Sequence, residues 1–280
     1  MAFDLDLYLE RIRLPARPDA DLAGLQALQR AHRLAIPFEN LDVILGRGIR
    51  IDSESVFAKL VTERRGGYCF EHNRLFGDAL EALGFAARPL LARVWLGAEH
   101  VPPLTHALSL VTIDGEEWIA DTGFGGSYAP PMPLADGAEA EAPDGARFRL
   151  SRDPSYGWML ERHGSGETTD GRTAMAAPES FHGAQYSFTL AEAYPADFAL
   201  GNHWTSTAPA TRFTSLRLAS LVLPHGFASL TDRFYKRRNG DSAAEAEITD
   251  PRVYRMRLSM MFGIDLTVEE VAALGLFGGL

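Results

Sequence analysis

The chain has 280 residues, of which 46% are hydrophobic and 23% charged, a composition typical of a globular protein with one large domain or two to three small ones. Its formal net charge is −10 and it has no long lysine- and arginine-rich block, which argues against a nucleic-acid-binding surface. No apolar run approaches the length of a membrane span. We therefore expect neither nucleic acid nor membrane among its partners.

Cys69 is the only cysteine, which excludes an intramolecular disulfide and a multi-cysteine zinc site. The first residues are acidic and amphipathic, and lack the continuous apolar stretch of a secretory signal. These features predict a protein of a reducing, cytoplasmic setting that holds no metal.

Helical patterns dominate the first part of the chain. Apolar residues recur at helical spacing over residues 3–12, about 20–34, 53–63 and 69–83. We therefore predict a helical bundle over residues 1–85.

Short β-rich runs follow, at residues 88–96, 105–113, 117–121 and 185–190, with Gly, Pro and Asp between them. They predict a small antiparallel sheet or barrel over residues 86–190. Within this segment, residues 130–145 are rich in Pro, Ala, Asp and Glu, and we expect a surface loop there.

The last segment, residues 191–280, mixes helical and strand patterns. A short helix is expected near 190–200, strands near 213–223 and 226–236, and a final helix at the capping-box pair Thr267 and Glu270. The basic run Lys236-Arg237-Arg238 is expected to be a solvated turn, although it could meet a phosphorylated ligand. The chain thus divides into three unlike segments.

Cys69 follows Gly66-Gly67-Tyr68 and opens the helical pattern of residues 69–83. A sulfur at a helix N-terminus lies near unpaired N–H groups and the positive end of the helix dipole, which favour the reactive thiolate. A lone cysteine is more often a small buried hydrophobic residue. The preceding glycines favour a nucleophile instead.

A cysteine nucleophile needs a base within hydrogen-bond reach and a third group that orients the base. His72 lies on the next turn of the same helix, where it has little freedom to align with the sulfur. His106 lies in a β-run that ends at Asp114-Gly115, a strong signal for a two-residue hairpin. We therefore favour His106 over His72.

The hairpin places a carboxylate near His106. If Asp114 and Gly115 form the turn, His106 falls opposite Gly123, and Asp121 becomes its diagonal neighbour at about 7–8 Å between backbones. An aspartate at that place can fix the imidazole tautomer and stabilise the imidazolium. A structural histidine beside a strand-end aspartate is the alternative. With the helix start at Cys69, the pattern predicts a Cys69-His106-Asp121 triad.

Two further motifs flank these residues. Residues 122–127 form a glycine-rich turn that could let backbone approach a ligand or could be only a sharp bend. Phe38, in Pro37-Phe38-Glu39-Asn40, is expected in the core, with a place in a pocket wall as the alternative.

These motifs together resemble those of the arylamine N-acetyltransferases. They run in that family's order from about residue 37 to 209, and the chain length fits. The segments that carry the resemblance are Pro37-Phe38-Glu39-Asn40, Arg64 with Gly66-Gly67-Tyr68-Cys69-Phe70-Glu71 and Asn73, His106, Asp121-Thr122-Gly123-Phe124-Gly125, and Asn202-His203-Trp204-Thr205-Ser206-Thr207-Ala208-Pro209.

The resemblance implies a multidomain α+β fold with a cysteine-protease-like core: a helical bundle, an antiparallel β-barrel and a C-terminal α/β lid. It implies acetyl-CoA as co-substrate and an acetyl group carried on Cys69, with His106 as base and Asp121 orienting it. Phe38, Phe124 and Trp204 would bind the aromatic amine or hydrazine. Thr105, Phe124 and Gly125 would contact coenzyme A. His203 departs from the family, which often has an aromatic residue there.

The resulting hypothesis is a ping-pong transfer from acetyl-CoA to an arylamine or arylhydrazine nitrogen through acetyl-Cys69. A thiol hydrolase or protease-like enzyme could use the same triad, as could an amide synthase acting on a biosynthetic intermediate. A non-catalytic binding module would not need all three residues. The sequence is compatible with a homo-oligomer and does not separate a xenobiotic from a biosynthetic role.

Overall fold

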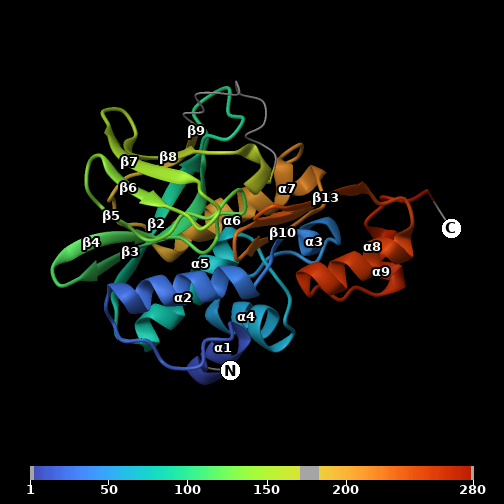
Figure 1. Cartoon of the computed structure of the whole chain (residues 1–280), viewed down its shortest axis with the longest axis horizontal. Helices are drawn as coiled ribbons and strands as arrows, with labels where there is room; N and C mark the ends of the chain where they lie inside the picture. Colours follow the sequence, from blue (N-terminus) through green and yellow to red (C-terminus); the bar gives the residue numbers. More distant parts are fainter. Residues whose placement is uncertain (1–2, 171–182, 279–280) are drawn as a thin grey trace.

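The computed structural model describes residues 3–170 and 183–278. Helices of the N-terminal part, a β-barrel and a C-terminal unit of helices around a sheet follow one another along the chain (Figure 1). The predicted α+β fold class is confirmed. In the described part of the chain, no helix has the length and apolar character needed to cross a membrane.

Aspartate side chains start three of the N-terminal helices. Asp4, Asp21 and Asp52 each precede a helix and accept a backbone N–H of its first turn, which satisfies a donor that has no partner within the helix. The pattern predicted over residues 53–63 continues beyond its α-helix as a π-helical turn at 58–62. The helices are α1 (Leu5–Arg11), α2 (Leu22–Ala35), α3 (Leu41–Ile44), α4 (Ser53–Phe57) and α5 (Cys69–Ala82).

Helix α5 joins the N-terminal helices to the barrel. Its residues Leu75, Phe76 and Leu80 are fully buried in one apolar cluster that also contains Val111 and Ala120 from the barrel hairpin. Because this cluster is shared, the start of α5 is held at a fixed position relative to that hairpin.

Eight antiparallel strands form a nearly closed barrel, in the order β5-β4-β3-β2-β9-β8-β7-β6. Two of them, β5 and β6, lie where the sequence predicts a surface loop. In β6, alanines alternate with glutamates, and Ala138 and Ala140 pack on the barrel core. Because side chains of a strand alternate between its two faces, this pattern buries one face and forms a strand, although alanine and glutamate are weak β-formers. The strands are β2 (Ala86–Val94), β3 (Leu104–Ile113), β4 (Glu116–Ala120), β5 (Met132–Pro133), β6 (Ala138–Glu141), β7 (Arg147–Asp153), β8 (Gly157–His163) and β9 (Gly183–Phe188).

The predicted hairpin between β3 and β4 is present with the predicted register. Asp114 and Gly115 both have positive φ, 51° and 83°, as a two-residue turn of this kind requires. Ile113 pairs with Glu116, and the ladder continues to the pair Ser109 and Ala120. The strand ends there, so the chain leaves the ladder at the next residue and the expected pairing of His106 with Gly123 does not form.

The C-terminal unit contains α6 (Pro195–Thr207), α7 (Arg212–Ser215), α8 (Pro251–Arg257), α9 (Val268–Ala273) and a sheet of order β1-β10-β11-β12-β13. Strand β1 comes from the N-terminal part, where Phe38 pairs with Ser220. The predicted capping box of Thr267 and Glu270 is present at α9. The strands are β1 (Phe38–Glu39), β10 (Leu218–Leu223), β11 (Gly226–Thr231), β12 (Phe234–Asn239) and β13 (Ser242–Glu247).

Three details of this unit differ from the sequence expectations. The strand expected from residue 213 begins at Leu218, because α7 precedes it, started by the bond from the Thr211 amide to the Thr214 hydroxyl. A turn at Asp232 divides the expected 226–236 strand in two. The run 236–238 lies within β12 rather than in a turn, and Lys236 pairs there with acidic side chains.

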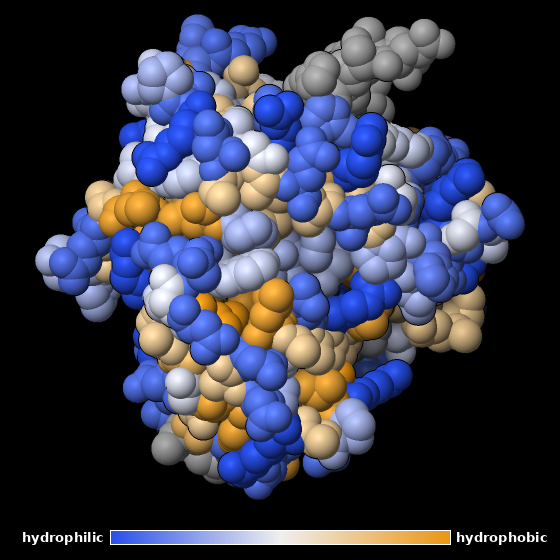
Figure 2. Space-filling view, turned by 60° about the vertical axis from the view of Figure 1, so that its left-hand side comes forward, coloured by the Kyte–Doolittle hydropathy of each residue, from blue (hydrophilic) through white to orange (hydrophobic). Residues whose placement is uncertain are grey.

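Polar residues cover most of the face shown in Figure 2, and apolar residues emerge between them in separate patches, mainly in its lower part. Figure 1 places the N-terminal helices in that part of the molecule.

Candidate active site

The glycines before Cys69 are required by close packing. A Cβ atom on Gly66 would lie 2.2 Å from the carbonyl oxygen of Pro37, and one on Gly67 would lie 2.7 Å from Oε2 of Glu71. The same Glu71 carboxylate accepts the Tyr68 amide at 2.9 Å and so caps the helix that begins at Cys69.

A buried ionic cluster holds the segment that leads to Cys69. Arg65 donates to Glu39 at 2.7 and 3.0 Å and reaches Asp42 at 3.2 Å. Lys59 contacts Asp42 at 2.9 Å and Glu71 at 2.7 Å. Each of these side chains is at most 15% exposed. Breaking one such pair leaves an uncompensated buried charge, so the cluster gives the segment a single arrangement.

His106 and Asp121 meet beside this helix start. The His106 side chain is 2% exposed, and its Nε2 lies 2.7 Å from Oδ2 of Asp121. Because an ionised carboxylate only accepts, Nε2 carries the hydrogen and Nδ1 is the ring nitrogen left for another partner.

Burial opposes ionisation of Asp121, but its partners outweigh burial and lower its pKa. The charge and hydrogen bond of His106 contribute most, followed by donors from Asn73 and the Gly123 amide, which reach Oδ1 at 3.1 and 2.8 Å. The carboxylate is therefore ionised at neutral pH and fixed at both oxygens.

The Cys69 thiol donates to the Thr105 carbonyl oxygen at 3.5 Å. Burial raises the pKa of Cys69, and the charge of Asp121 raises it further. Backbone N–H groups of Ala107 and Phe70 act in the opposite direction. Of these two groups only the Phe70 amide belongs to the helix start, and burial outweighs both, in contrast to the expected thiolate. Ionisation of this thiol therefore requires a group that takes its proton.

His72 is turned away from the sulfur. It donates from Nε2 to the Pro37 carbonyl oxygen at 3.1 Å, and its Nδ1 accepts from Nε2 of His32 at 2.8 Å. His32 in turn accepts the Tyr8 hydroxyl at 2.9 Å. Burial lowers the pKa of His72 to about 3. Both of its ring nitrogens are occupied, which leaves none for Cys69.

A cavity of about 210 Å³ contains both Cys69 and His106. All five residues expected to bind substrate or coenzyme also line it, whereas Asp121 lies behind His106 and outside the lining. The full lining is Phe38, Cys69, Val94, Leu96, Pro103, Thr105, His106, Gly123, Phe124, Gly125, Trp204, Thr205, Thr211, Arg212 and Phe213.

Aromatic rings form much of the cavity wall. The Phe38 ring stacks on His72 with an interplanar angle of 15° and a centroid distance of 6.2 Å. The Phe124 ring stands edge-on to His106 at 5.3 Å. Trp204 is 51% exposed at the mouth, while the neighbouring His203 is exposed and outside the lining. Phe38 thus belongs both to a buried cluster and to the wall.

Three residues near the site carry no role in the sequence analysis: Arg33, Asn73 and Tyr186. Arg33, 3% exposed, donates to the carbonyl oxygens of Thr122, Phe124 and Ser127 and thereby fixes the glycine-rich turn. Its signal in the sequence is a cation on the apolar face of α2.

The sequence gives weaker indications of a role for Tyr186 and Asn73. The Tyr186 ring, on β9, packs on His106 at 5.0 Å past the intervening strand β2, a contact that local sequence cannot reveal. Asn73 lies four residues after Cys69, one turn further along the same helix, which places the two side chains near one face.

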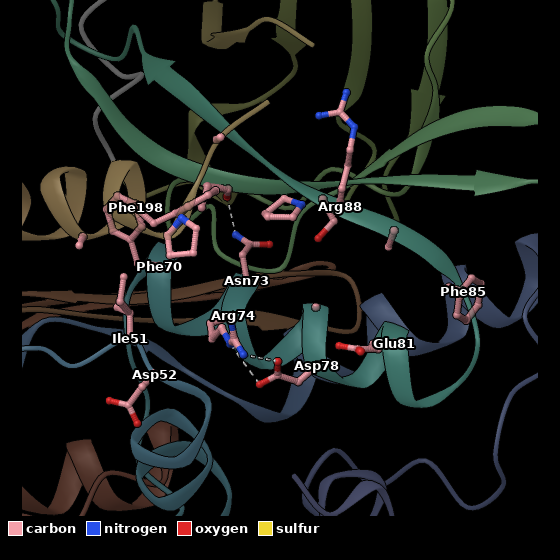
Figure 3. A pocket seen from close by; sticks show the side chains of 18 of the residues that line it. Ile51, Asp52, Phe70, Asn73, Arg74, Asp78, Glu81, Phe85, Arg88 and Phe198 are labelled. Atoms are coloured by element: carbon pink, nitrogen blue, oxygen red, sulfur yellow. Dashed lines mark hydrogen bonds and ion pairs between the residues drawn. The ribbon is translucent and has the colours of Figure 1, made fainter. Parts of the chain in front are cut away.

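A larger cavity of about 770 Å³ lies along α5, β2, β3 and the first half of α6 (Figure 3). Small side chains such as Ala87 and Ala107, and Gly77 on α5, leave this space open. Cys69, His106 and Asp121 are absent from its lining, although Asn73 belongs to it.

Within residues 3–170 and 183–278, no group of three or more His, Cys, Asp or Glu side chains is placed to hold a metal ion.

Comparison with known proteins agrees with this geometry. A family model described as N-acetyltransferase matches residues 21–271. The arylamine N-acetyltransferase of Escherichia coli K12 is 34% identical over 279 residues, which cover 96% of this chain and 94% of the relative.

Solved structures give the same result. The arylamine N-acetyltransferase from Salmonella typhimurium superimposes with a TM-score of 0.87 at 32% identity and covers 96% of this chain and 97% of its own. The Mycobacterium marinum arylamine N-acetyltransferase in complex with CoA gives 0.85 at 29% identity, with 97% and 98% covered.

The fold and the family model define an acyltransferase of the N-acetyltransferase class. Within that class, the chain belongs to the arylamine N-acetyltransferases, which are acetyl-CoA-dependent enzymes.

Proposed function

We propose that the protein transfers an acetyl group from acetyl-CoA to the nitrogen of an arylamine or arylhydrazine in two steps, through a thioester on Cys69. The observation that carries this proposal is the 2.7 Å contact between His106 and Asp121 beside a cavity that also contains the only sulfhydryl of the chain.

In the first step, Nδ1 of His106 takes the thiol proton as the sulfur attacks the thioester carbonyl. The raised pKa of Cys69 makes this transfer necessary, and the ionised Asp121 stabilises the resulting imidazolium. When the tetrahedral intermediate collapses, the carbon–sulfur bond to coenzyme A breaks, and the proton on His106 goes to the departing sulfur.

In the second step, the neutral aryl nitrogen attacks the acetyl carbonyl on Cys69. His106 accepts the nitrogen's proton and returns it to the sulfur of Cys69 as the amide forms. A weakly basic aryl nitrogen suits this site, because it enters uncharged and the described residues that line the cavity include no carboxylate.

The size of the cavity supports a divided reaction. At about 210 Å³ it is smaller than the roughly 300–1,000 Å³ typical of sites for drug-sized ligands. Such a space suits one group at a time, so the coenzyme leaves before the amine enters. Phe38, Phe124 and Trp204 would hold the aromatic ring, while Thr105, Phe124 and Gly125 would contact coenzyme A, as the resemblance to a family with a CoA-bound member implies.

Intact-protein mass spectrometry after mixing with acetyl-CoA alone tests the proposal. We expect one acetyl adduct that disappears when an arylamine is added. An adduct that persists in Cys69→Ala, or no adduct on folded wild-type protein, would refute the scheme.

Release of coenzyme A separates this activity from a thiol hydrolase. With no amine present, the proposed enzyme releases one equivalent of coenzyme A and stops, whereas a hydrolase continues to turn over. Continued release without amine would favour hydrolysis.

A further inference from the structure

The side chain of Asn73 joins the three segments that carry Cys69, His106 and Asp121. Its amide nitrogen lies 3.2 Å from the Cys69 carbonyl oxygen on α5, 2.5 Å from that of Ala107 on β3, and 3.1 Å from Oδ1 of Asp121. Ala107 directly follows His106. A single amide group is therefore in contact with the helix, the strand and the loop that build the site.

The amide of Asn73 fits this place in only one orientation. Its nitrogen side faces three acceptors, while its oxygen accepts the Thr122 amide at 3.2 Å. A carboxylate of the same shape would still accept the Thr122 amide. Its second oxygen, however, cannot donate to the oxygens of Cys69, Ala107 and Asp121, and would repel them.

Asn73 also separates Asp121 from the larger cavity. Figure 3 shows its side chain directed from α5 toward β3, with a hydrogen bond to the Ala107 carbonyl oxygen. Asn73 is 7% exposed and lines that cavity, whereas Asp121 does not.

We infer that Asn73 is a positioning residue for the acyl-transfer step, which acts by holding the Asp121 carboxyl group directed at His106. The inference rests on the proposed function. Together with the Gly123 amide, Asn73 donates to Oδ1 and so leaves Oδ2 for His106 and opposes rotation of the carboxylate. It touches no reacting atom.

The titratable and charged groups that face Asp121 come from four elements. They are His106 on β3, Arg33 on α2, Tyr186 on β9 and Cys69 on α5. None of them carries a second carboxylate, so a carboxyl group introduced at position 73 would be the only other carboxyl group facing Asp121 among residues 3–170 and 183–278.

The substitution Asn73→Asp tests the inference because it preserves shape and inverts the hydrogen-bonding character of one group. The measurement is the single-turnover rate constant for acetylation of the protein by acetyl-CoA, divided by that of wild type, from pH 8 to pH 5.5. At pH 8 we expect a loss of about 100-fold, since two adjacent carboxylates repel and a donor to a charged group is gone.

As the pH falls, the introduced carboxyl binds a proton and can again donate to Asp121. The ratio to wild type should therefore rise, by about tenfold per pH unit while this proton binds. In Asn73→Ala no donor can be regained, so its loss, about tenfold or more, should persist over the whole range. Arg74→Ala is the matched control. Arg74 is the next residue, lines the same cavity and forms an ion pair with Asp78 on its own helix, so its substitution should leave wild-type behaviour.

A ratio for Asn73→Asp that is flat with pH would overturn the inference, as would wild-type rates in Asn73→Ala. Failure of both variants to fold at every pH would overturn it too, because Asn73 would then serve the fold rather than the site. Failure of the proposed function looks different: wild-type protein itself would then form no adduct on Cys69.

Discussion

The backbone of Gly125 lies directly against the ring of Phe38, and a Cβ atom on Gly125 would stand 2.5 Å from Cδ1 of that ring. Phe38 cannot withdraw freely, because its other face stacks on the buried His72. Gly125→Ala should therefore displace part of the cavity wall. We expect the KM for a bulky arylamine to rise about tenfold, as overpacking costs on the order of 1–3 kcal/mol.

Gly77→Ala is the control for that substitution. Gly77 lies within α5, and a Cβ atom there would meet no other atom within 4 Å. Alanine should stabilise the protein against urea by about 1 kcal/mol and leave the KM unchanged. An unchanged KM in Gly125→Ala would contradict the packing argument.

Asp121→Asn should nearly abolish acetylation of Cys69. An amide in place of the carboxylate can present a donor to Nε2 of His106, which then favours the wrong tautomer and no longer stabilises the imidazolium. We expect the single-turnover rate constant to fall by about 10³-fold or more. Asp78→Asn, on the outer side of α5 beside Ser53 and Arg74, should keep wild-type rates. More than a tenth of the activity left in Asp121→Asn would exclude the orienting role.

The buried guanidinium of Arg33 should contribute strongly to stability. Arg33→Met leaves the carbonyl oxygens of Thr122, Phe124 and Ser127 without this donor, at a cost of about 3 kcal/mol or more. Arg33→Lys keeps the charge but cannot span the same three acceptors, so its loss should be smaller. Urea denaturation of both variants measures the difference. Equal stability of Arg33→Met and wild type would show that water replaces the guanidinium.

The sequence predicts those parts of the site that depend on local patterns. Asp114-Gly115 determines the register of one hairpin, and the glycines before Cys69 mark a helix start; both are encoded by residues adjacent in sequence. The β-rich runs of residues 86–190 predict an antiparallel sheet or barrel, and the family resemblance favours the barrel. The contact of His106 with Asp121 follows from the hairpin, although the strand ends earlier than the simple register assumes.

The contacts that complete the site depend on tertiary packing. Tyr186 on β9 reaches His106 on β3 past strand β2, and Arg33 reaches a loop about ninety residues away in sequence. Strand β6 could not be predicted for another reason. Alanine and glutamate are weak β-formers, and the strand is recognised from the burial of Ala138 and Ala140 in the folded protein.

The buried pair of His72 and His32 should make stability depend on pH. Burial lowers the pKa of His72 from 6.5 to about 3 and lowers that of His32 as well. Between these values the unfolded chain binds more protons than the folded one, so stability is complete above about pH 6.5 and falls as the pH drops toward 3. His72 alone should cost on the order of 1.4 kcal/mol per pH unit in that window.

Urea denaturation at pH 7.5, 6 and 5 checks this dependence. His72→Gln should be less stable than wild type at pH 7.5 and should show a smaller slope with pH. His203→Gln is the control, because His203 is exposed and should leave the slope unchanged. Equal slopes in wild type and His72→Gln would show that the buried imidazole does not govern the pH response.

Trp204→Ala should separate binding of the amine from acetylation of the protein. Trp204 lines the cavity mouth but is 51% exposed, so its loss should change stability by no more than about 0.5 kcal/mol. A stacked aromatic pair contributes about 0.5–1.5 kcal/mol, which corresponds to a rise in arylamine KM of roughly two- to tenfold. Leu200→Ala, one turn earlier on α6, 70% exposed and outside the lining, should change neither quantity. If both variants raise the KM equally, or if Trp204→Ala slows acetylation by acetyl-CoA instead, then Trp204 does not bind the amine.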